Sequence, residues 1–234
     1  MPTLSTAKTV LLIGATRGLG FAMTAEYLQR GYQVIATGRE GSKQRLAALA
    51  EQYPQSLRIE SLDINVAEQL TALHSRLSQQ PVDLLFVNAG VKNADDETIA
   101  DVTTEEFIRV MVTNSLSPMR VIETFQDLVV ATGTIGVMSS GQGSLTNNTV
   151  GNYELYRGSK AALNMFMRSF AARHSDDART LLLMAPGWVR TDMGGPQARL
   201  TIDESIPNLV NTMENYQGRG GLHYLDYLGR VVPW

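Results

Sequence analysis

The chain has 234 residues, of which 44% are hydrophobic and 18% charged, an ordinary globular balance that argues against disorder. Its net charge of -3 gives no reason to expect nucleic acid or an anionic membrane as a partner. The lack of cysteine excludes disulfides, thiol catalysis and zinc–thiolate sites, and the histidines are too scattered for a metal site. Near the N-terminus the apolar run Val10–Ile13 is too short for a signal-peptide core or a membrane span. We therefore expect a soluble, cytoplasmic protein without a metal.

Short β-branched, apolar runs alternate with longer amphipathic stretches along the chain. This alternation is typical of βαβ units and a parallel sheet. It predicts strands at Lys8–Ile13, Gln33–Thr37, Leu57–Ser61, Val82–Val87, Thr134–Met138, Arg179–Met184 and, more weakly, Leu222–Leu225. It predicts helices at about Leu19–Arg30, Lys43–Gln52, Val66–Gln79, Thr104–Val130 and Tyr153–His174. No linker divides the chain, so we expect one α/β domain over residues 1–234.

The segment Thr191–Gly221 breaks this alternation, with glycines clustered at both ends. Between them, Thr201 and Glu204 form a capping box that predicts the start of a short helix. A glycine-hinged helical excursion before the last strand is typical of a lid over a binding site, here residues 191–221. The alternative is a surface connection without a functional role.

A glycine-rich turn, Gly14-Ala-Thr-Arg-Gly18-Leu-Gly20, directly follows the first predicted strand. Glycines at such a turn let backbone N–H groups approach a pyrophosphate at the positive end of the next helix. The spacing differs by one residue from the common dinucleotide fingerprint, and a glycine-rich loop is often only a turn. Its place between a strand and a helix favours cofactor binding.

The end of the second strand distinguishes NAD from NADP, because NAD sites place a carboxylate there whereas a 2′-phosphate needs cations. The chain has Gly38 where an acid is expected, and Arg39 follows it. With Arg17 of the glycine turn, two guanidinium groups favour NADP(H) over NAD(H). Glu40 adjoins Arg39 and would partly neutralise it, and the alternative is that both arginines are ordinary surface groups.

Two more segments follow predicted strands. Asp63, just past the third strand, is placed to accept a hydrogen bond from an adenine amino group, or else it caps the helix from Val66 onward. Asn88-Ala-Gly90 closes the fourth strand, where small residues admit the adenosine half of a cofactor. Asn-Ala-Gly is also a plain turn sequence.

Pro118 interrupts the long helix predicted from Thr104. Proline lacks an N–H, so the carbonyl of Asn114, four residues earlier, loses its helical partner. A free carbonyl there would hold a water that relays protons between solvent and Lys160. The alternative is a kink that serves packing alone.

The fifth and sixth predicted strands end in Ser139-Ser140 and Pro186-Gly-Trp-Val-Arg-Thr191. Ligands bind at the carboxyl ends of open parallel sheets. A serine hydroxyl there would donate to a carbonyl oxygen as negative charge develops. The two serines project to opposite sides, so only one is expected to serve. The backbone of residues 186–191 would hold the nicotinamide carboxamide, with Thr191 at the amide or phosphate.

Tyr156 and Lys160 lie four residues apart and therefore share one face of a predicted helix. A phenol has a pKa of about 10 and would need a neighbouring cation to lower it for neutral catalysis. A lysine at residue 160 would do this and would also reach ribose hydroxyls. Tyr-x-x-x-Lys also occurs by chance, so the pair gains weight from the other motifs.

Taken together, the motifs resemble those of the short-chain dehydrogenase/reductase family, in the subgroup with Gly-x-x-x-Gly-x-Gly and Tyr-x-x-x-Lys. The resemblance runs from Lys8 to Trp234, and the stretches from Tyr156 to Met165 and from Asp226 to Trp234 look like C-factor and sniffer-type carbonyl reductases. It implies a single-domain, doubly wound sheet of about seven strands with helices on both faces. It also implies a catalytic tetrad of Asn114, Ser140, Tyr156 and Lys160, with Ser140 chosen because Gly141-Gln-Gly143 follows it.

The resulting cofactor site comprises Gly14, Thr16, Arg17, Gly18, Leu19, Gly20, Arg39, Asp63, Ile64, Asn88, Ala89, Gly90, Tyr156, Lys160, Pro186, Gly187, Val189 and Thr191. The leading hypothesis is an NADPH-dependent reductase of a small or medium-sized aldehyde or ketone, with Tyr156 as proton donor. The alternative is a dinucleotide-binding signalling or sensor protein with little turnover. The resemblance further implies a possible homodimer or homotetramer, and leaves the substrate open.

Overall fold

The computed structural model describes residues 7–94 and 97–234, so residues 1–6 and 95–96 of the predicted domain lie outside the described residues. The described chain forms a seven-stranded sheet in the order β3-β2-β1-β4-β5-β6-β7, with every neighbouring pair parallel. The strands are β1 (Thr9–Ile13), β2 (Gln33–Gly38), β3 (Leu57–Ser61), β4 (Val82–Val87), β5 (Val129–Met138), β6 (Thr180–Ala185) and β7 (Gly221–Asp226). The predicted sheet is confirmed.

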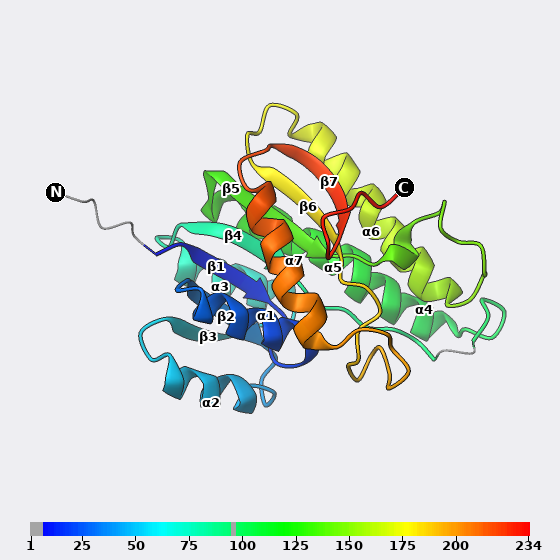
Figure 1. Ribbon diagram of the computed structural model, residues 1–234, viewed down its shortest axis with the longest axis horizontal. Coiled ribbons are helices and arrows are strands. Elements are labelled where there is room, and N and C mark those ends of the chain that lie inside the picture. The colour runs from blue at the N-terminus through cyan, green and yellow to red at the C-terminus, as the bar shows by residue number, and fades with distance from the viewer. Residues whose placement is uncertain (1–6, 95–96) are drawn as a thin grey trace.

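Helices cover both faces of this sheet (Figure 1). They are α1 (Gly18–Gln29), α2 (Gln44–Gln52), α3 (Ala67–Leu77), α4 (Thr104–Met111), α5 (Ser117–Phe125), α6 (Glu154–Arg173) and α7 (Ile202–Tyr216). Side chains alternate along each strand, so Leu11 packs in one core with α3, α5 and α6, whereas Leu12 packs in the other with α1, α2 and α7. The sheet is thus doubly wound, and its strand order reverses between β1 and β4.

The helix predicted over Thr104–Val130 is helical as far as Phe125, but it is not one continuous α-helix and its predicted end is wrong. After α4 the chain makes a π-helical turn, η1 (Val112–Leu116), in which the N–H of Ser117 reaches back five residues to the carbonyl of Val112. Pro118 lacks the N–H that an ordinary helix would bond to the carbonyl of Asn114, so the normal pattern is interrupted at this point before ordinary helix resumes in α5. Helix α5 then ends at Phe125, a 3₁₀ turn η2 (Gln126–Leu128) follows, and β5 already begins at Val129.

Strand β5 is longer than its apolar core because it contains an irregularity. Its pairing with β4 shifts between Val82 and Leu84, where the chain carries Gly133. A Cβ at Gly133 would lie 2.7 Å from a methyl of Val129, so the bend requires glycine. Ala131 and Thr132 in this bend are exposed, so the first half of the strand lacks a pattern of alternating apolar residues. Among the described residues, no helix is long and apolar enough to cross a membrane.

Candidate active site

The glycine-rich turn is packed so tightly that side chains would not fit. Gly14 has a φ of +86°, and a Cβ there would lie 2.8 Å from the Cα of Ala89. A Cβ at Gly20 would lie 2.1 Å from the carbonyl oxygen of Gly14. Gly18 begins α1, whose N-cap Arg17 makes no side-chain capping bond and whose first turn contains no acidic residue. The positive end of α1 therefore has no capping side chain and suits an anionic pyrophosphate.

The Asn-Ala-Gly segment joins this turn to the end of β4. The side-chain amide of Asn88 donates to the carbonyl of Gly14 at 2.8 Å. The backbone N–H groups of Asn88 and Ala89 both donate to the carbonyl of Ile13, at 2.9 and 3.2 Å. These contacts place the predicted cofactor residues of β1 and β4 together at the strand-order reversal, where open α/β sheets bind ligands.

At the end of β2, Glu40 is held by residues other than Arg39. The hydroxyl of Ser61 donates to Glu40 at 2.6 Å, and the ammonium of Lys43 lies 3.4 Å from the same oxygen. The bond from Ser61, followed by the charge of Lys43, lowers the pKa of the Glu40 carboxyl. The predicted neutralisation of Arg39 by Glu40 is therefore not what the structure shows. Lys43, which the sequence analysis missed, adds a third cation to this corner, four residues after Arg39 in the sequence.

Two more of the predicted cofactor residues, Arg17 and Asp63, interact with other residues of the chain. Arg17 forms an ion pair with Asp192 at 3.1 Å, and both side chains are mostly exposed. The carboxylate of Asp63 accepts the N–H of Asn65 at 2.9 Å, and α3 begins only at Ala67 after Val66 as N-cap. Asp63 is thus not the helix cap of the alternative interpretation, and its place beyond β3 is compatible with the predicted adenine contact.

Asn114 lies fully buried inside the π-helical turn. Its side-chain oxygen accepts the N–H of Val91 at 2.8 Å, and its amide nitrogen donates to the carbonyl of Val91 at 2.7 Å and to the hydroxyl of Ser159 at 2.9 Å. Asn114 therefore connects the loop after β4 to α6. A Cβ at Gly90 would lie 3.3 Å from the Asn114 oxygen and 3.5 Å from the Lys160 ammonium, so this glycine leaves space between them.

Tyr156 and Lys160 lie one turn apart on α6, with the ammonium 5.8 Å from the centre of the phenol ring. The ammonium donates to the carbonyl of Met138 at 2.9 Å, and burial lowers the pKa of Lys160 to about 8. Burial also raises the pKa of Tyr156 to about 12, which a hydrogen bond with Ser140 partly offsets and Tyr224 reinforces. In the protein without cofactor, desolvation therefore outweighs any lowering of the phenol pKa by Lys160, whose ammonium is bound to β5.

The two serines after β5 have different surroundings. Ser139 is buried, and its hydroxyl donates to the side-chain oxygen of Asn164 at 2.6 Å. Ser140 is half-buried, accepts the N–H of Gln142 at 3.2 Å and hydrogen-bonds with Tyr156. Ser140 is therefore the serine that the structure brings to the phenol.

The loop after β6 approaches the glycine turn. Gly187 has a φ of +83°, and a Cβ at this position would lie 2.5 Å from a methyl of Leu200. The Thr191 hydroxyl accepts the N–H of Gly194 at 3.0 Å. A Cβ at Gly18 would meet the methyl of Thr191 at 3.7 Å, so this loop lies directly against the start of α1. The predicted nicotinamide and pyrophosphate segments are thus neighbours.

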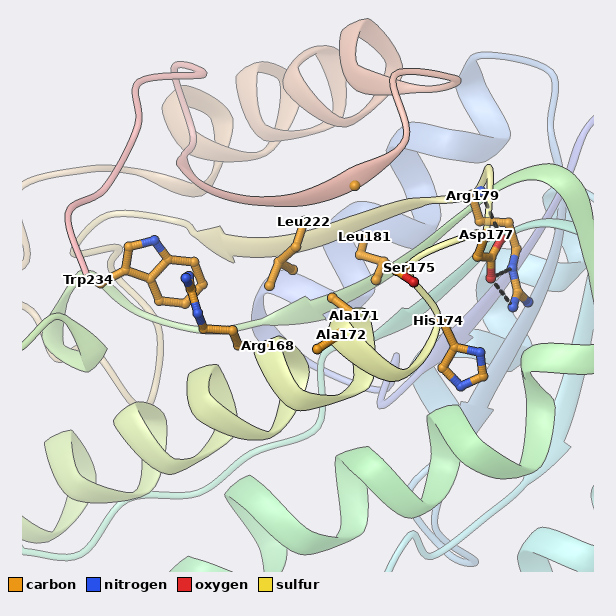
Figure 2. Close-up of a pocket in the computed structure, with 11 residues that line it drawn as sticks. Arg168, Ala171, Ala172, His174, Ser175, Asp177, Arg179, Leu181, Leu222 and Trp234 are labelled. Carbon is orange, nitrogen blue, oxygen red and sulfur yellow. Dashed lines mark hydrogen bonds and ion pairs between the residues drawn. The ribbon is translucent and has the colours of Figure 1, made fainter.

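A cavity of about 390 Å³ elsewhere on the molecule is a different feature (Figure 2). It runs along α6 and the outer strands, with Trp234 and Arg168 at one end and His174 at the other. Arg179 in its wall is paired with Asp177. The residues that line this cavity are not members of the predicted site, and it does not reach the Tyr156 phenol.

Comparison with known proteins shows which family the chain is similar to. The family model for short chain dehydrogenases matches residues 8–199. C-signal of Myxococcus xanthus is 34% identical over 167 residues, which cover 70% of this chain and 100% of that protein. A Burkholderia multivorans structure described as a short-chain dehydrogenase/reductase with bound NADP is 56% identical with a TM-score of 0.96, covering 98% of this chain and 100% of that one. A Pseudomonas aeruginosa carbonyl reductase in complex with NADP is 34% identical with a TM-score of 0.90, at the same coverage.

The match thus spans most of the chain, and relatives of comparable length share its whole fold. Together with the glycine turn, the buried Lys160 and the contact of Ser140 with Tyr156, it identifies the chain as a member of the short-chain dehydrogenase/reductase family of oxidoreductases.

Proposed function

We propose that this protein is an NADPH-dependent reductase that converts an aldehyde or ketone to an alcohol. The observation that carries the proposal is the contact of the Ser140 hydroxyl with the Tyr156 phenol, one helical turn from the buried Lys160. These three groups lie at the carboxyl end of β5, beside the glycine-rich turn of residues 14–20 (the glycine cradle) at the ends of β1 and β4. NADP in the two solved relatives supports the choice of cofactor.

The residues present fit a dinucleotide because the cradle excludes side chains at Gly14 and Gly20 and leaves the positive end of α1 available. When bound, the reduced nicotinamide supplies a hydride. We assign the pyrophosphate to the turn of residues 14–20, the adenosine to Asp63, Ile64 and residues 88–90, and the nicotinamide to residues 186–191. Lys160 would hold the nicotinamide ribose.

The protein's own groups stabilise and protonate the developing alkoxide. The Ser140 hydroxyl donates a hydrogen bond to the substrate oxygen, and Tyr156 transfers its phenol proton to that oxygen. A pKa of about 12 keeps the phenol protonated at neutral pH, which suits a donor. Lys160, with a pKa of about 8, changes protonation near neutral pH and is therefore suited to replenish that proton. We assign the relay water between Lys160 and solvent to the carbonyl of Asn114.

Tyr156→Phe tests this mechanism directly. We expect turnover of every carbonyl substrate to fall by at least about a thousandfold, because the proton donor is lost. NADPH affinity should change less than about twofold, since the phenylalanine keeps the ring in place. Fluorescence titration of NADPH and absorbance assays of the same preparation measure the two quantities. A variant with more than a tenth of wild-type activity would remove Tyr156 from the mechanism.

The preference for NADPH rests on the cations at the end of β2. Arg39 is exposed there, and Glu40 is engaged by Ser61 and Lys43. Arg39→Asp should weaken NADPH binding by about a hundredfold and leave NADH binding within about threefold, because only NADPH carries the 2′-phosphate. Equal losses for both nucleotides would contradict the assignment.

Exposed apolar side chains indicate the character of the substrate. Leu145 and Trp188 follow β5 and β6 and are 77% and 48% exposed, so packing does not account for them. We propose that they contact an apolar part of the substrate, with Met193 nearby in sequence.

The lid over the binding site, predicted for residues 191–221, remains a proposal. We limit it to residues 191–200, because α7 contributes Ile206 and Val210 to the core.

We also propose that the protein forms a homodimer, or a tetramer built from dimers, through α4 and α6. These neighbouring helices carry exposed Phe107, Ile108, Met165 and Phe166. Light scattering at micromolar concentration measures this, and a monomeric mass would exclude it.

The rival function is a signalling or sensor protein that binds the dinucleotide with little turnover. The similarity to C-signal favours it. The contact of Ser140 with Tyr156 favours catalysis, because a sensor needs only the nucleotide site. An assay of NADPH absorbance with a panel of aldehydes and ketones distinguishes the reductase from the sensor. No loss of absorbance across a broad panel would favour the sensor.

A further inference from the structure

A buried hydroxyl on the last strand contacts the active-site turn from behind. Tyr224 of β7 is 2% exposed, and its hydroxyl donates to the main-chain oxygen of Ser140. Burial raises the pKa of Tyr224, and the neighbouring side chains of Asn164 and Ser139 partly offset this rise. Asn164 in turn accepts from Ser139 at 2.6 Å and donates to the carbonyl of Gly143 at 3.2 Å. Tyr224 and Asn164 therefore each hold a carbonyl of the turn, those of Ser140 and Gly143.

The chain end fixes Tyr224 in this position. After β7 the chain turns back, and the N–H of Val232 donates to the carbonyl of Tyr224 at 2.9 Å. The indole of Trp234 then lies 5.5 Å from the Tyr224 ring, between centroids, and the Arg168 guanidinium lies 5.1 Å from the indole (Figure 2). The carbonyl of Trp234 also accepts two hydrogen bonds from Thr146, at 2.6 Å from its hydroxyl and 3.1 Å from its N–H. The same tail thus holds both Tyr224 and the loop beyond the turn.

The turn also has hydrogen bonds of its own: the Ser140 carbonyl accepts the N–H of Gly143 at 2.9 Å, and the N–H of Ser139 donates to the carbonyl of Met184 at 2.8 Å. Ser140 is extended, and the short 3₁₀ turn Gly141–Gly143 that follows it begins and ends with glycine. A Cβ at Gly141 would meet nothing within 4 Å, so packing at Gly141 adds no restraint on the peptide between residues 140 and 141. The direction of the Ser140 hydroxyl follows the main chain at this point. The hydrogen bond from Tyr224 is a restraint on the orientation of that peptide.

We propose that Tyr224 is a positioning residue: its hydroxyl fixes the Ser140 peptide so that the Ser140 side chain faces Tyr156, with Trp234 holding Tyr224 in place. The inference rests on the proposed reductase function. A phenylalanine would fill the same space, so the buried hydroxyl is explained by its partners rather than by packing. Small displacements of a catalytic group have large kinetic effects, which gives this contact a measurable consequence.

The experiment compares Tyr224→Phe with Tyr32→Phe. The control also removes one phenol hydroxyl with a partner, because Tyr32 donates to Glu214 at 2.8 Å, but Glu214 lies on α7, away from the catalytic turn. We expect kcat of Tyr224→Phe to fall about tenfold with KM within about twofold, whereas the control keeps both. In a Ser140→Ala background, Tyr224→Phe should cause no further loss, because its effect passes through Ser140.

A second measurement does not depend on turnover. Amide hydrogen exchange at Gln142 and Gly143, whose N–H groups bond to Ser140, should quicken in Tyr224→Phe and remain unchanged in Tyr32→Phe. If the wild type reduces carbonyls but the losses from Ser140→Ala and Tyr224→Phe multiply, the inference is overturned while the proposed function stands. If the wild type reduces none, the proposed function fails, and unchanged exchange at these two amides would overturn the inference as well.

Discussion

The two halves of the sheet edge are built by different means. At β1 and β4 the site is made of backbone: the glycines lie so near the neighbouring main chain that a Cβ would not fit, and one side-chain amide, that of Asn88, joins the two strands. At β5 and β7 the site is made of side chains that are distant in sequence. There Ser140 meets Tyr156 of α6 and Tyr224 of β7, and Lys160 bonds to the end of β5.

This difference determines how each half responds to change. A backbone cradle depends on the absence of a Cβ, so even alanine should damage it. The side-chain half depends on hydrogen bonds and on the protonation of buried groups. Its variants should therefore fold but alter rate or pH dependence. Substitutions in the two halves should fail in these two distinct ways.

The largest stability effect is expected from Gly20→Ala in the cradle. The new Cβ would lie 2.1 Å from the carbonyl oxygen of Gly14 and 2.6 Å from the amide nitrogen of Asn88, so the turn must open. We expect a loss of about 3 kcal/mol in the free energy of unfolding, as for severe overpacking. NADPH affinity should fall at least about a hundredfold. Urea denaturation and fluorescence titration measure these two losses.

Gly158→Ala is the matched control, because Gly158 is also a helical glycine but a Cβ there would meet nothing within 4 Å. Alanine at this exposed position of α6 should stabilise the protein by about 1 kcal/mol. If both substitutions changed stability alike, the special character of the cradle would be refuted.

The strands could be predicted from the sequence wherever their apolar runs are short and uninterrupted. Strands β3 and β4 have the predicted bounds, and β7 was found despite its weak pattern. The start of β5 was missed because the irregularity beside Gly133 leaves Ala131 and Thr132 exposed inside the strand. Pro118 indicated a break in the long helix, but its form, a π-helical turn around Asn114, depends on tertiary contacts with Val91 and Ser159.

The sequence indicated the site residues only where the residues of a motif lie together in one short segment. The glycine turn and Tyr156 with Lys160 are local patterns, and the structure assembles them at one edge. The roles of Tyr224, Asn164 and Lys43 had no local signal, since an aromatic residue in a strand or a lysine at a helix start is ordinary. The phenol pKa was also out of reach, because its direction depends on burial, which only the folded chain defines.

Lys160→Met provides a smaller and pH-dependent test of the side-chain half. The pKa of Lys160 in the folded protein is about 8, below the 10.5 of an ordinary lysine. The unfolded chain therefore binds more protons between these values, and stability should rise with pH from about 8 to about 10.5. Methionine has a similar shape and no charge. At pH 7 the variant should be more stable than the wild type by at most about 3 kcal/mol. This gain is reduced by the free energy that the lost hydrogen bond to the Met138 carbonyl contributes in the wild type.

The pH dependence is the sharper measurement, because the lost hydrogen bond lowers the stability of the variant equally at both pH values. Urea denaturation of both proteins at pH 7 and 9.5 should show the advantage of Lys160→Met shrinking by about 2 kcal/mol, as the wild-type lysine loses its proton in the folded state. Both values lie below the range in which the raised pKa of Tyr156 would reduce stability, from about 10 to about 12. Lys8 is exposed, so Lys8→Met should change the free energy of unfolding little at either pH. A stability difference between Lys160→Met and the wild type that did not change with pH would mean that the pKa of Lys160 is not lowered in the folded protein. The side-chain half of the site would then show no more pH dependence than the glycine half.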